Sequence, residues 1–476
     1  MKLRKTIILA VYLIAIGLSG IYLVSCGHQS MEGMIVFTRV PIDNFDIREN
    51  EIIHKYPGAQ IIAINSDNPD GTEIVLTNDF YSACSPNISY DASHMLFTAQ
   101  QNENDIWQIW EMNLEKRTSK QITDFNESCF GPAYLPANRL VFSRQIPESG
   151  TGPVHALFTM NLDGSNISQI TFQPHLDYTA TVLKEGRILM LTKQLYPESG
   201  DMMYMAMRPN GTKAELFYKG SPNRILNSQV DETEDGFVYF IEWGNGNPNS
   251  GDIISVHQNR PLFTRVNLTS EISGGFHSIL HTKSGKMLVS YRSTETGTIG
   301  LFNFSLIDQS LGESTYNPSE YHVLEPVLVE AYNRPRNLPD DVNPEESTAL
   351  LFCQDINVIG QQNDTILTDM EKATRVEVLG INKSLGFVPV EEDGSFYLKV
   401  TADTPIRLQT IDENGKVLYG PSGWIWLRPF ERRGCVGCHE DPELAPKNFV
   451  PLSVKKAPVS IPVVSSQEPE PASTTK

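Results

Sequence analysis

The sequence has few cysteines, a deficit of basic residues and no long apolar run beyond its first 25 residues. Six cysteines in 476 residues are too few for a disulfide-dense scaffold. Lysine and arginine number 38 against 57 acidic residues, a net charge of −19, which disfavours nucleic acid or an anionic membrane surface as a general partner. No G-x-S-x-G, Walker or H-E-x-x-H motif occurs, so common hydrolytic and nucleotide-dependent chemistries have no signature.

The composition is that of a folded, β-rich protein. Hydrophobic residues make up 40% and charged residues 20%, which excludes a wholly disordered chain. The 33 glycines and 30 prolines indicate many turns between strands. The length predicts two or three domains, although a single β-propeller could also take up most of the chain.

The N-terminus has the features of an export signal. Three basic residues among the first five precede an apolar stretch, 7–24, which is followed by Cys26. This order predicts a signal peptide over 1–25, and it resembles the bacterial lipobox, in which the cysteine is lipidated. We therefore expect a tether over 26–33 and a lipid anchor in the bacterial cell envelope, on the periplasmic face of the outer membrane, because Gly27 replaces the aspartate of inner-membrane lipoproteins. A transmembrane anchor is the alternative, since about 18 apolar residues approach a bilayer-spanning length.

Six apolar runs of strand length recur through the middle of the chain, their centres 45 to 60 residues apart. They are Ile35–Arg39, Met95–Ala99, Leu140–Arg144, Ile188–Thr192, Phe237–Ile241 and Met287–Tyr291. Such a period, with Asp-Gly and Asn-Gly turns inside it, is typical of propeller blades. We expect an all-β fold with a six-bladed β-propeller over 34–330, closed by a strand at 322–329; an open β-rich array is the alternative. The repeats resemble the TolB-type propeller family.

The chain changes character after the repeats. A proline-spaced linker is expected over 331–345. Four strand-like runs with Asp-Gly and Asn-Gly turns predict a small antiparallel sandwich within a haem domain at 346–452; the runs are 375–379, 386–390, 394–400 and 406–411. The last segment, 453–476, is rich in Pro, Ser, Val and Thr, and we expect it to be disordered.

A c-type haem attachment pattern lies at the end of the second domain. Cys435, Cys438 and His439 form C-V-G-C-H, in which two thiols add across the vinyl groups of one porphyrin and the histidine becomes the proximal iron ligand. The alternatives are a zinc knuckle or a disulfide beside a histidine. A closed zinc site needs four ligands, and no second Cys/His pair stands at suitable spacing. The sequence therefore predicts one covalent haem c.

The segments around this motif resemble those of proteins related to the hydrazine synthase alpha subunit. The resemblance is carried by 424–446, 388–396, 402–405 and 448–454. It implies a propeller followed by a haem domain, with Cys435 and Cys438 binding the haem and His439 its iron. The synthase subunit has a further haem in a domain before its propeller, which belongs to its catalytic centre. Only about eight residues separate Cys26 from the first blade strand and no second motif occurs, so we expect that domain, and the synthase chemistry, to be lacking.

The sequence does not identify the sixth ligand of the haem iron. The resemblance implies a second histidine, yet no histidine stands between 331 and 438, where Met370 is the only methionine. The candidates are Met370, the propeller residues His277, His281 and His322, or a second subunit, although packing or surface roles are commoner for such residues. One of Trp424 and Trp426 is a candidate to pack on the haem.

Two further cysteines, Cys84 and Cys129, occupy matching points of consecutive repeats, 13 residues before Phe97 and Phe142. They are a possible disulfide if neighbouring blades bring them within reach.

Three functions follow from these features. The first is a membrane-anchored periplasmic monohaem cytochrome whose propeller docks a redox partner. Such a protein is more an electron carrier than a catalyst on its own. A basic partner suits the acidic chain. The alternative is a binding or scaffold lipoprotein with the haem as sensor or structural element. A haem-dependent oxidoreductase with an open iron site is the third.

Overall fold

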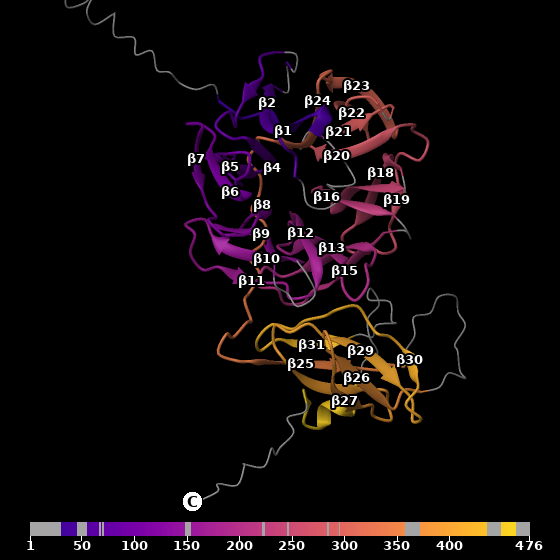
Figure 1. Cartoon of the computed structure of the whole chain (residues 1–476). Coiled ribbons are helices and arrows are strands. Elements are labelled where there is room, and N and C mark those ends of the chain that lie inside the picture. The colour runs from indigo at the N-terminus through magenta and orange to yellow at the C-terminus, as the bar shows by residue number, and fades with distance from the viewer. Residues whose placement is uncertain are drawn as a thin grey trace, which may run out of the picture.

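The computed structural model describes residues 30–44, 55–65, 68, 71–147, 154–220, 224–244, 247–282, 285–294, 296–357, 372–435 and 449–462. Within these ranges the chain forms strands and two short 3-10 helices, Ile42–Asn44 and Ser453–Lys455, with no α-helix. A ring of sheets is followed by a second, smaller β-domain (Figure 1).

In the described residues up to 328 the strands form six blades of four, so the expected six-bladed β-propeller is confirmed. Blades 3 and 4 are joined into one sheet by a single parallel bridge, His155 opposite Leu176. Blade 1 holds β24 (Tyr321–Leu328), β1 (Met34–Pro41), β2 (Gln60–Asn65) and β3 (Ile74–Val75). Blade 2 holds β4 (Ser82–Ile88), β5 (His94–Gln100), β6 (Gln108–Asn113) and β7 (Thr118–Gln121). Blade 3 holds β8 (Cys129–Leu135), β9 (Arg139–Ile146), β10 (Val154–Asn161) and β11 (Ser168–Gln169).

The remaining three blades follow the same plan. Blade 4 holds β12 (His175–Val182), β13 (Ile188–Gln194), β14 (Met202–Met207) and β15 (Glu215–Lys219). Blade 5 holds β16 (Ile225–Glu232), β17 (Phe237–Gly244), β18 (Asn247–His257) and β19 (Val266–Asn267). Blade 6 holds β20 (Gly275–His281), β21 (Met287–Arg292), β22 (Gly300–Ser305) and β23 (Ser310–Tyr316). The six apolar runs of the sequence each form the second strand of a blade.

The ring is closed between its last and first strands. β24 pairs antiparallel with β1 over Ile35–Pro41, so a strand from the end of the propeller completes the first blade. Glu325 on β24 is 2% exposed. Its carboxylate accepts the hydroxyl of Thr38 at 2.5 Å and the N–H of Ser85 at 2.6 Å, and its own N–H donates to the hydroxyl of Ser278 at 3.1 Å. One buried carboxylate therefore joins blades 1 and 2 while its backbone is held by blade 6.

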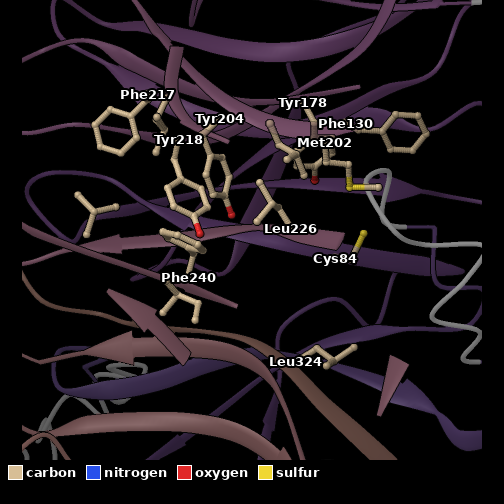
Figure 2. Packing of buried hydrophobic residues seen from close by; sticks show 14 of the residues in the cluster. Cys84, Phe130, Tyr178, Met202, Tyr204, Phe217, Tyr218, Leu226, Phe240 and Leu324 are labelled. Carbon is tan, nitrogen blue, oxygen red and sulfur yellow. The ribbon is translucent and has the colours of Figure 1, made fainter. Parts of the chain in front are cut away.

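The apolar side chains of neighbouring blades meet in continuous clusters. The largest runs through the ring and contains large side chains such as Phe130, Tyr178, Tyr204 and Phe240 (Figure 2). Tyr204 and Phe240, from adjacent blades, have ring centroids 5.0 Å apart in an edge-on arrangement. Burial of such aromatic surface is the main stabilising contribution expected between blades.

The second domain is a sandwich of two four-stranded sheets. One sheet has the order β31 (Arg432–Cys435), β25 (Thr348–Cys353), β28 (Phe396–Thr401) and β32 (Val459–Ile461). The other has the order β27 (Ser384–Pro389), β26 (Arg375–Leu379), β29 (Arg407–Ile411) and β30 (Val417–Tyr419). Side chains from both sheets fill one core, including Leu351, Val376 and Phe396. The sequence predicted an antiparallel sandwich, and this is correct only in part. β31 and β32 join their sheet by parallel pairing.

The expectation of a disordered tail from residue 453 is wrong for its first ten residues. Ser453–Lys455 forms a 3-10 helix and β32 pairs with β28, with Ile461 opposite Val400. Ile461 is 3% exposed and belongs to the sandwich core. Val459 also packs against this core, and the high Pro, Ser and Thr content of the segment hid both contacts. Residues 463–476 lie outside the described ranges.

The segment between the domains, 331–345, lies along the propeller. Tyr332 donates its hydroxyl to Ile88 O at 2.8 Å, and the Arg336 N–H donates to Lys184 O at 3.1 Å. Gly186 has φ +102, and a Cβ there would stand 2.1 Å from Arg336 O, so only glycine allows this approach. The predicted linker is thus extended chain bound to blades 2 and 4.

The sandwich docks on blades 3 and 4 through the segment before β31. Trp426 is 1% exposed among propeller side chains that include Ile170 and Met190. The indole N–H of Trp424 donates to Tyr196 O at 2.7 Å. Both tryptophans are therefore used in docking, which corrects the suggestion that one of them packs on a haem.

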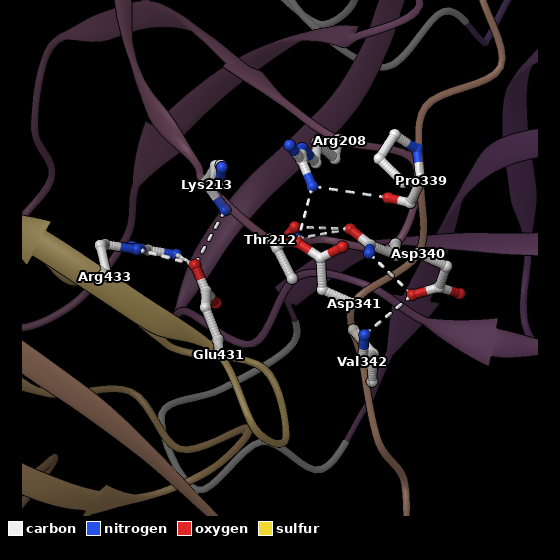
Figure 3. A network of polar contacts seen from close by, with 10 residues as sticks. Arg208, Thr212, Lys213, Pro339, Asp340, Asp341, Val342, Glu431 and Arg433 are labelled. Carbon is white, nitrogen blue, oxygen red and sulfur yellow. Dashed lines mark hydrogen bonds and ion pairs between the residues drawn. The ribbon is translucent and has the colours of Figure 1, made fainter.

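A buried carboxylate fixes the start of β31 against the propeller (Figure 3). Glu431 is 4% exposed; it accepts the N–H of Lys213 at 2.9 Å, the N–H of Arg428 at 2.8 Å and two guanidinium donors of Arg433 at 3.0 and 2.8 Å. Lys213 belongs to the β14–β15 turn of blade 4. The same turn region binds the linker, since Arg208 pairs with Asp341 at 2.8 Å.

Replacing Glu431 by alanine is expected to lower the free energy of unfolding by about 3 kcal/mol, because several buried donors lose a charged acceptor. Denaturant titration followed by tryptophan fluorescence measures this, since Trp424 and Trp426 lie in the docked surface. The matched control is Glu413→Ala, which changes an exposed glutamate in a turn of the same domain. A midpoint for Glu431→Ala equal to that of the control would contradict the anchoring role.

Candidate functional site

The first cysteine of the haem motif ends an edge strand. β31 is the outer strand of its sheet and pairs in parallel with β25, with Arg433 opposite Leu351 and Cys435 opposite Cys353. Gly434 is exposed, and a Cβ built on it would stand 2.9 Å from the ring of Phe352. The ring of Phe352 thus covers the edge strand where glycine leaves room.

Cys435 is partly exposed at the end of the sandwich where several chain segments meet. Its carbonyl accepts the N–H of Gln354 at 3.4 Å, and the Ile356 N–H donates to Gly394 O at 2.9 Å. The N–H of Leu452 donates to Asp393 at 2.7 Å. The chain thus leaves this end after Cys435 and is held to it again at Leu452. Residues 436–448, which include Cys438 and His439, lie outside the described ranges.

The carboxylate of Asp393 holds this end together. Burial alone would raise its pKa, but hydrogen bonds from the Ser395 hydroxyl, the Leu452 N–H and the Ser395 N–H outweigh burial, so the pKa lies below its usual value. The carboxylate therefore stays charged at neutral pH and continues to accept these donors.

The described part of the motif suits a thioether-bound porphyrin. Cys435 is accessible on an edge strand, which leaves one side of its sheet open. Where the described chain resumes, Phe449 is 41% and Val450 67% exposed. A haem needs apolar side chains against its faces, and these two residues lie three and two positions before Leu452, which is tied to the same end. No group of three or more His, Cys, Asp and Glu in the described part of the chain is arranged to hold a metal ion.

The propeller histidines considered as sixth ligands do not lie near Cys435. His277 and His281 are on β20 and His322 is on β24, on the side of the ring away from the sandwich (Figure 1). His322 accepts the N–H of Ile299 through Nδ1 at 3.0 Å, and burial, then the charge of Arg292, lowers its pKa to about 4. Burial likewise lowers the pKa of His277 and of His281. All three are components of blades 6 and 1.

Met370, the remaining candidate from this chain, lies outside the described ranges, but the residues that flank its segment are placed. The segment follows β25, which ends at Cys353 beside Cys435. Asn357 accepts the N–H of Ala373 through Oδ1 at 2.9 Å. The chain before and after 358–371 therefore meets at the end of the sandwich that carries Cys435.

The suggested disulfide between Cys84 and Cys129 is not formed. Cys84 pairs with Thr98 directly before the bulge of its blade, and the residue in that position of the next blade is Phe130, which pairs with Ser143. Cys129 is therefore shifted by one residue, and a one-residue shift turns a side chain to the other face of a strand. Cys84 and Phe130 both belong to the central cluster, whereas Cys129 belongs to a different cluster, with Phe142.

Sequence reasoning missed two residues near the site. The sequence does not single out Cys353, because nothing in a separation of 82 positions shows that it lies opposite Cys435. Glu431 follows Phe430 in a segment assigned to the haem motif by resemblance, so its contact with Lys213 carried no sequence signal. The predicted lipidation site Cys26 and the segment 1–25 lie outside the described ranges, within which no helix is long and apolar enough to cross a membrane.

Comparison with known proteins points to one group of relatives. A family model described as the hydrazine synthase alpha subunit middle domain matches residues 350–440. Hydrazine synthase subunit alpha of Kuenenia stuttgartiensis is 21% identical over 499 residues, covering 77% of this chain and 61% of that protein. The chain thus spans less than two thirds of that relative's length.

Solved structures show the same relation in the fold. A structure of Kuenenia stuttgartiensis hydrazine synthase has a TM-score of 0.73 at 19% identity, covering 90% of this chain and 71% of that chain. TolB from Acinetobacter baumannii has a TM-score of 0.46 at 12% identity, covering 64% of this chain and 69% of that one. From the matched sequence, the family model and the shared fold together, this chain is related to the hydrazine synthase alpha subunit.

Proposed function

We propose that this protein is a monohaem c-type cytochrome that transfers single electrons, with the propeller as the docking platform for a redox partner. The observation that carries the proposal is the C-V-G-C-H motif beginning at Cys435, on an accessible edge strand of a domain related to one in the hydrazine synthase alpha subunit. A bound c-type haem supplies a one-electron iron couple. The chain's net charge of −19 favours a partner with a basic surface.

The chain's own residues have distinct roles in this proposal. Cys435 and Cys438 would hold the porphyrin covalently, and His439 would ligate the iron from one side. The sandwich fixes Cys435 through the ladder between β31 and β25, and Glu431 fixes the start of β31 to blade 4. This rigid mounting suits electron transfer, which needs little movement of the residues around the iron.

A strong ligand on the second side of the iron would favour outer-sphere electron transfer over ligand binding. Met370 is the candidate that the connections of the sandwich favour, because its segment leaves and rejoins the domain at the end where Cys435 lies. His277, His281 and His322 belong to blades on the far side of the ring.

Absorption spectra of the haem-loaded protein test the proposal. We expect reversible reduction by dithionite and a reduced spectrum that carbon monoxide does not change, because His439 and Met370 would both bind the iron. Met370→Ala should bind carbon monoxide, whereas the propeller variant Met203→Ala should behave like the wild type. Rapid binding of carbon monoxide by the wild type would contradict electron transfer and favour a haem-dependent oxidoreductase. Iron that cannot be cycled would favour a sensor or structural role.

We also propose that the protein is exported and anchored by a lipid on Cys26, on the periplasmic face of the outer membrane. The basic and apolar order of residues 1–25 before a cysteine supports this. In a bacterial host, Cys26→Ser is expected to move the protein from the membrane fraction to the soluble fraction, and Cys129→Ser, which alters a buried blade cysteine, should leave it with the membranes. Equal partition of Cys26→Ser and wild type would contradict the lipid anchor.

A further inference from the structure

Cys353 has no part in the haem motif, yet the fold places it beside the first cysteine of that motif. It is the last residue of β25, is 0% exposed and belongs to the sandwich core. Every second residue of β25 faces this core, and Ala349, Leu351 and Cys353 are the buried ones. The position thus orients its thiol toward the interior and not toward solvent.

The ladder brings Cys435 to the same height and face. β25 and β31 run in parallel, and their register pairs Leu351 with Arg433 and Cys353 with Cys435. Side chains at paired positions lie on one face of a sheet. Cys435 packs against the same core cluster that contains Cys353.

The spacing of paired strands suits a covalent bond. Neighbouring strands lie about 4.8 Å apart, which is within the Cα separation of about 4.4 to 6.8 Å found in disulfides. Cys435 is the last residue of an edge strand, so its Cβ can approach that of Cys353 by a small local adjustment. The hydrogen bond from the Gln354 N–H to Cys435 O keeps the two chain ends together.

Cys353 and Cys435 form no disulfide in this structure. We propose that they form one in the chain before haem is attached, because the ladder holds them at paired positions. Each thiol loses a proton, one S–S bond forms, and two electrons pass to a disulfide-bonded oxidant such as a thiol–disulfide oxidoreductase, which is reduced to its dithiol. The bond masks Cys435 until a dithiol reductant exchanges with it and restores both thiols. The masking role rests on the proposed haem function, whereas the disulfide itself does not.

A competing bond joins Cys435 to Cys438, the second cysteine of the motif. The register favours Cys353, because the β ladder holds its Cα beside that of Cys435 in the folded domain. Because Cys353 is buried and Cys435 is partly exposed, a dithiol reductant would attack the sulfur of Cys435. The two disulfides differ in which peptides they connect, and this makes them distinguishable.

Peptide mapping of the haem-free protein tests the proposal. The full chain is exported in a host without cytochrome maturation, its remaining thiols are blocked with N-ethylmaleimide under denaturing conditions, and it is digested with trypsin without reduction. We expect peptide 337–372 linked to peptide 434–447 as the main form, with N-ethylmaleimide on Cys438 and not on Cys435 when the linked pair is fragmented, and its release by dithiothreitol. In Cys353→Ala the link should be lost, whereas in Cys129→Ala it should remain.

Two results would overturn the proposal: a 434–447 peptide that carries an internal disulfide as its main form, or Cys353 and Cys435 both recovered with N-ethylmaleimide. The peptide map of the wild type alone tests the disulfide, even if Cys353→Ala fails to fold. Haem staining of protein matured in a competent host tests the proposed function separately. If the peptides are linked but the matured protein does not stain for haem, the disulfide proposal stands and the cytochrome proposal is rejected.

Discussion

The parallel pairing of β31 with β25 is the contact on which the placement of the candidate site depends. β31 has only four residues, Arg432–Cys435, and lies at the edge of its sheet. Such a short edge strand has few ladder hydrogen bonds of its own, so its position is set by what holds its ends. Glu431 ties its start to the Lys213 N–H of blade 4, and Gln354 binds the carbonyl of Cys435 at its end. The propeller and the sandwich therefore both contribute to the position of one thiol.

The propeller itself rests on ring closure. The last strand of the propeller, β24, pairs with the first, β1, so the two ends of the ring are held in one blade. Glu325 reinforces the closure because its buried carboxylate accepts donors from blades 1 and 2. The closed ring supplies a rigid surface for the sandwich on blades 3 and 4, where Trp426 is buried among propeller side chains.

Repetition and alternation made most of the fold predictable from sequence. The six apolar runs repeat because the second strand of each blade is buried over at least four consecutive residues, as in β21. Strands such as β26 (Arg375–Leu379) show the period of two expected of a half-buried sheet. Long-range pairing was not predictable. The position of Cys353 beside Cys435 follows from parallel register, which no local pattern encodes, and the one-residue difference between Cys84 and Cys129 follows from turns of unequal length. The ordered strand at Val459–Ile461 was hidden because one buried isoleucine outweighs a polar composition.

Covalent attachment of one haem through Cys435 and Cys438 is the central claim, and the intact mass of the purified protein tests it most directly. The protein is made in a host that matures c-type cytochromes and is denatured before measurement, so that only covalently held groups remain. The predicted mass is that of the processed chain plus one haem, lost in a Cys435→Ser, Cys438→Ser double variant. A mass equal to that of the processed polypeptide alone would contradict the claim.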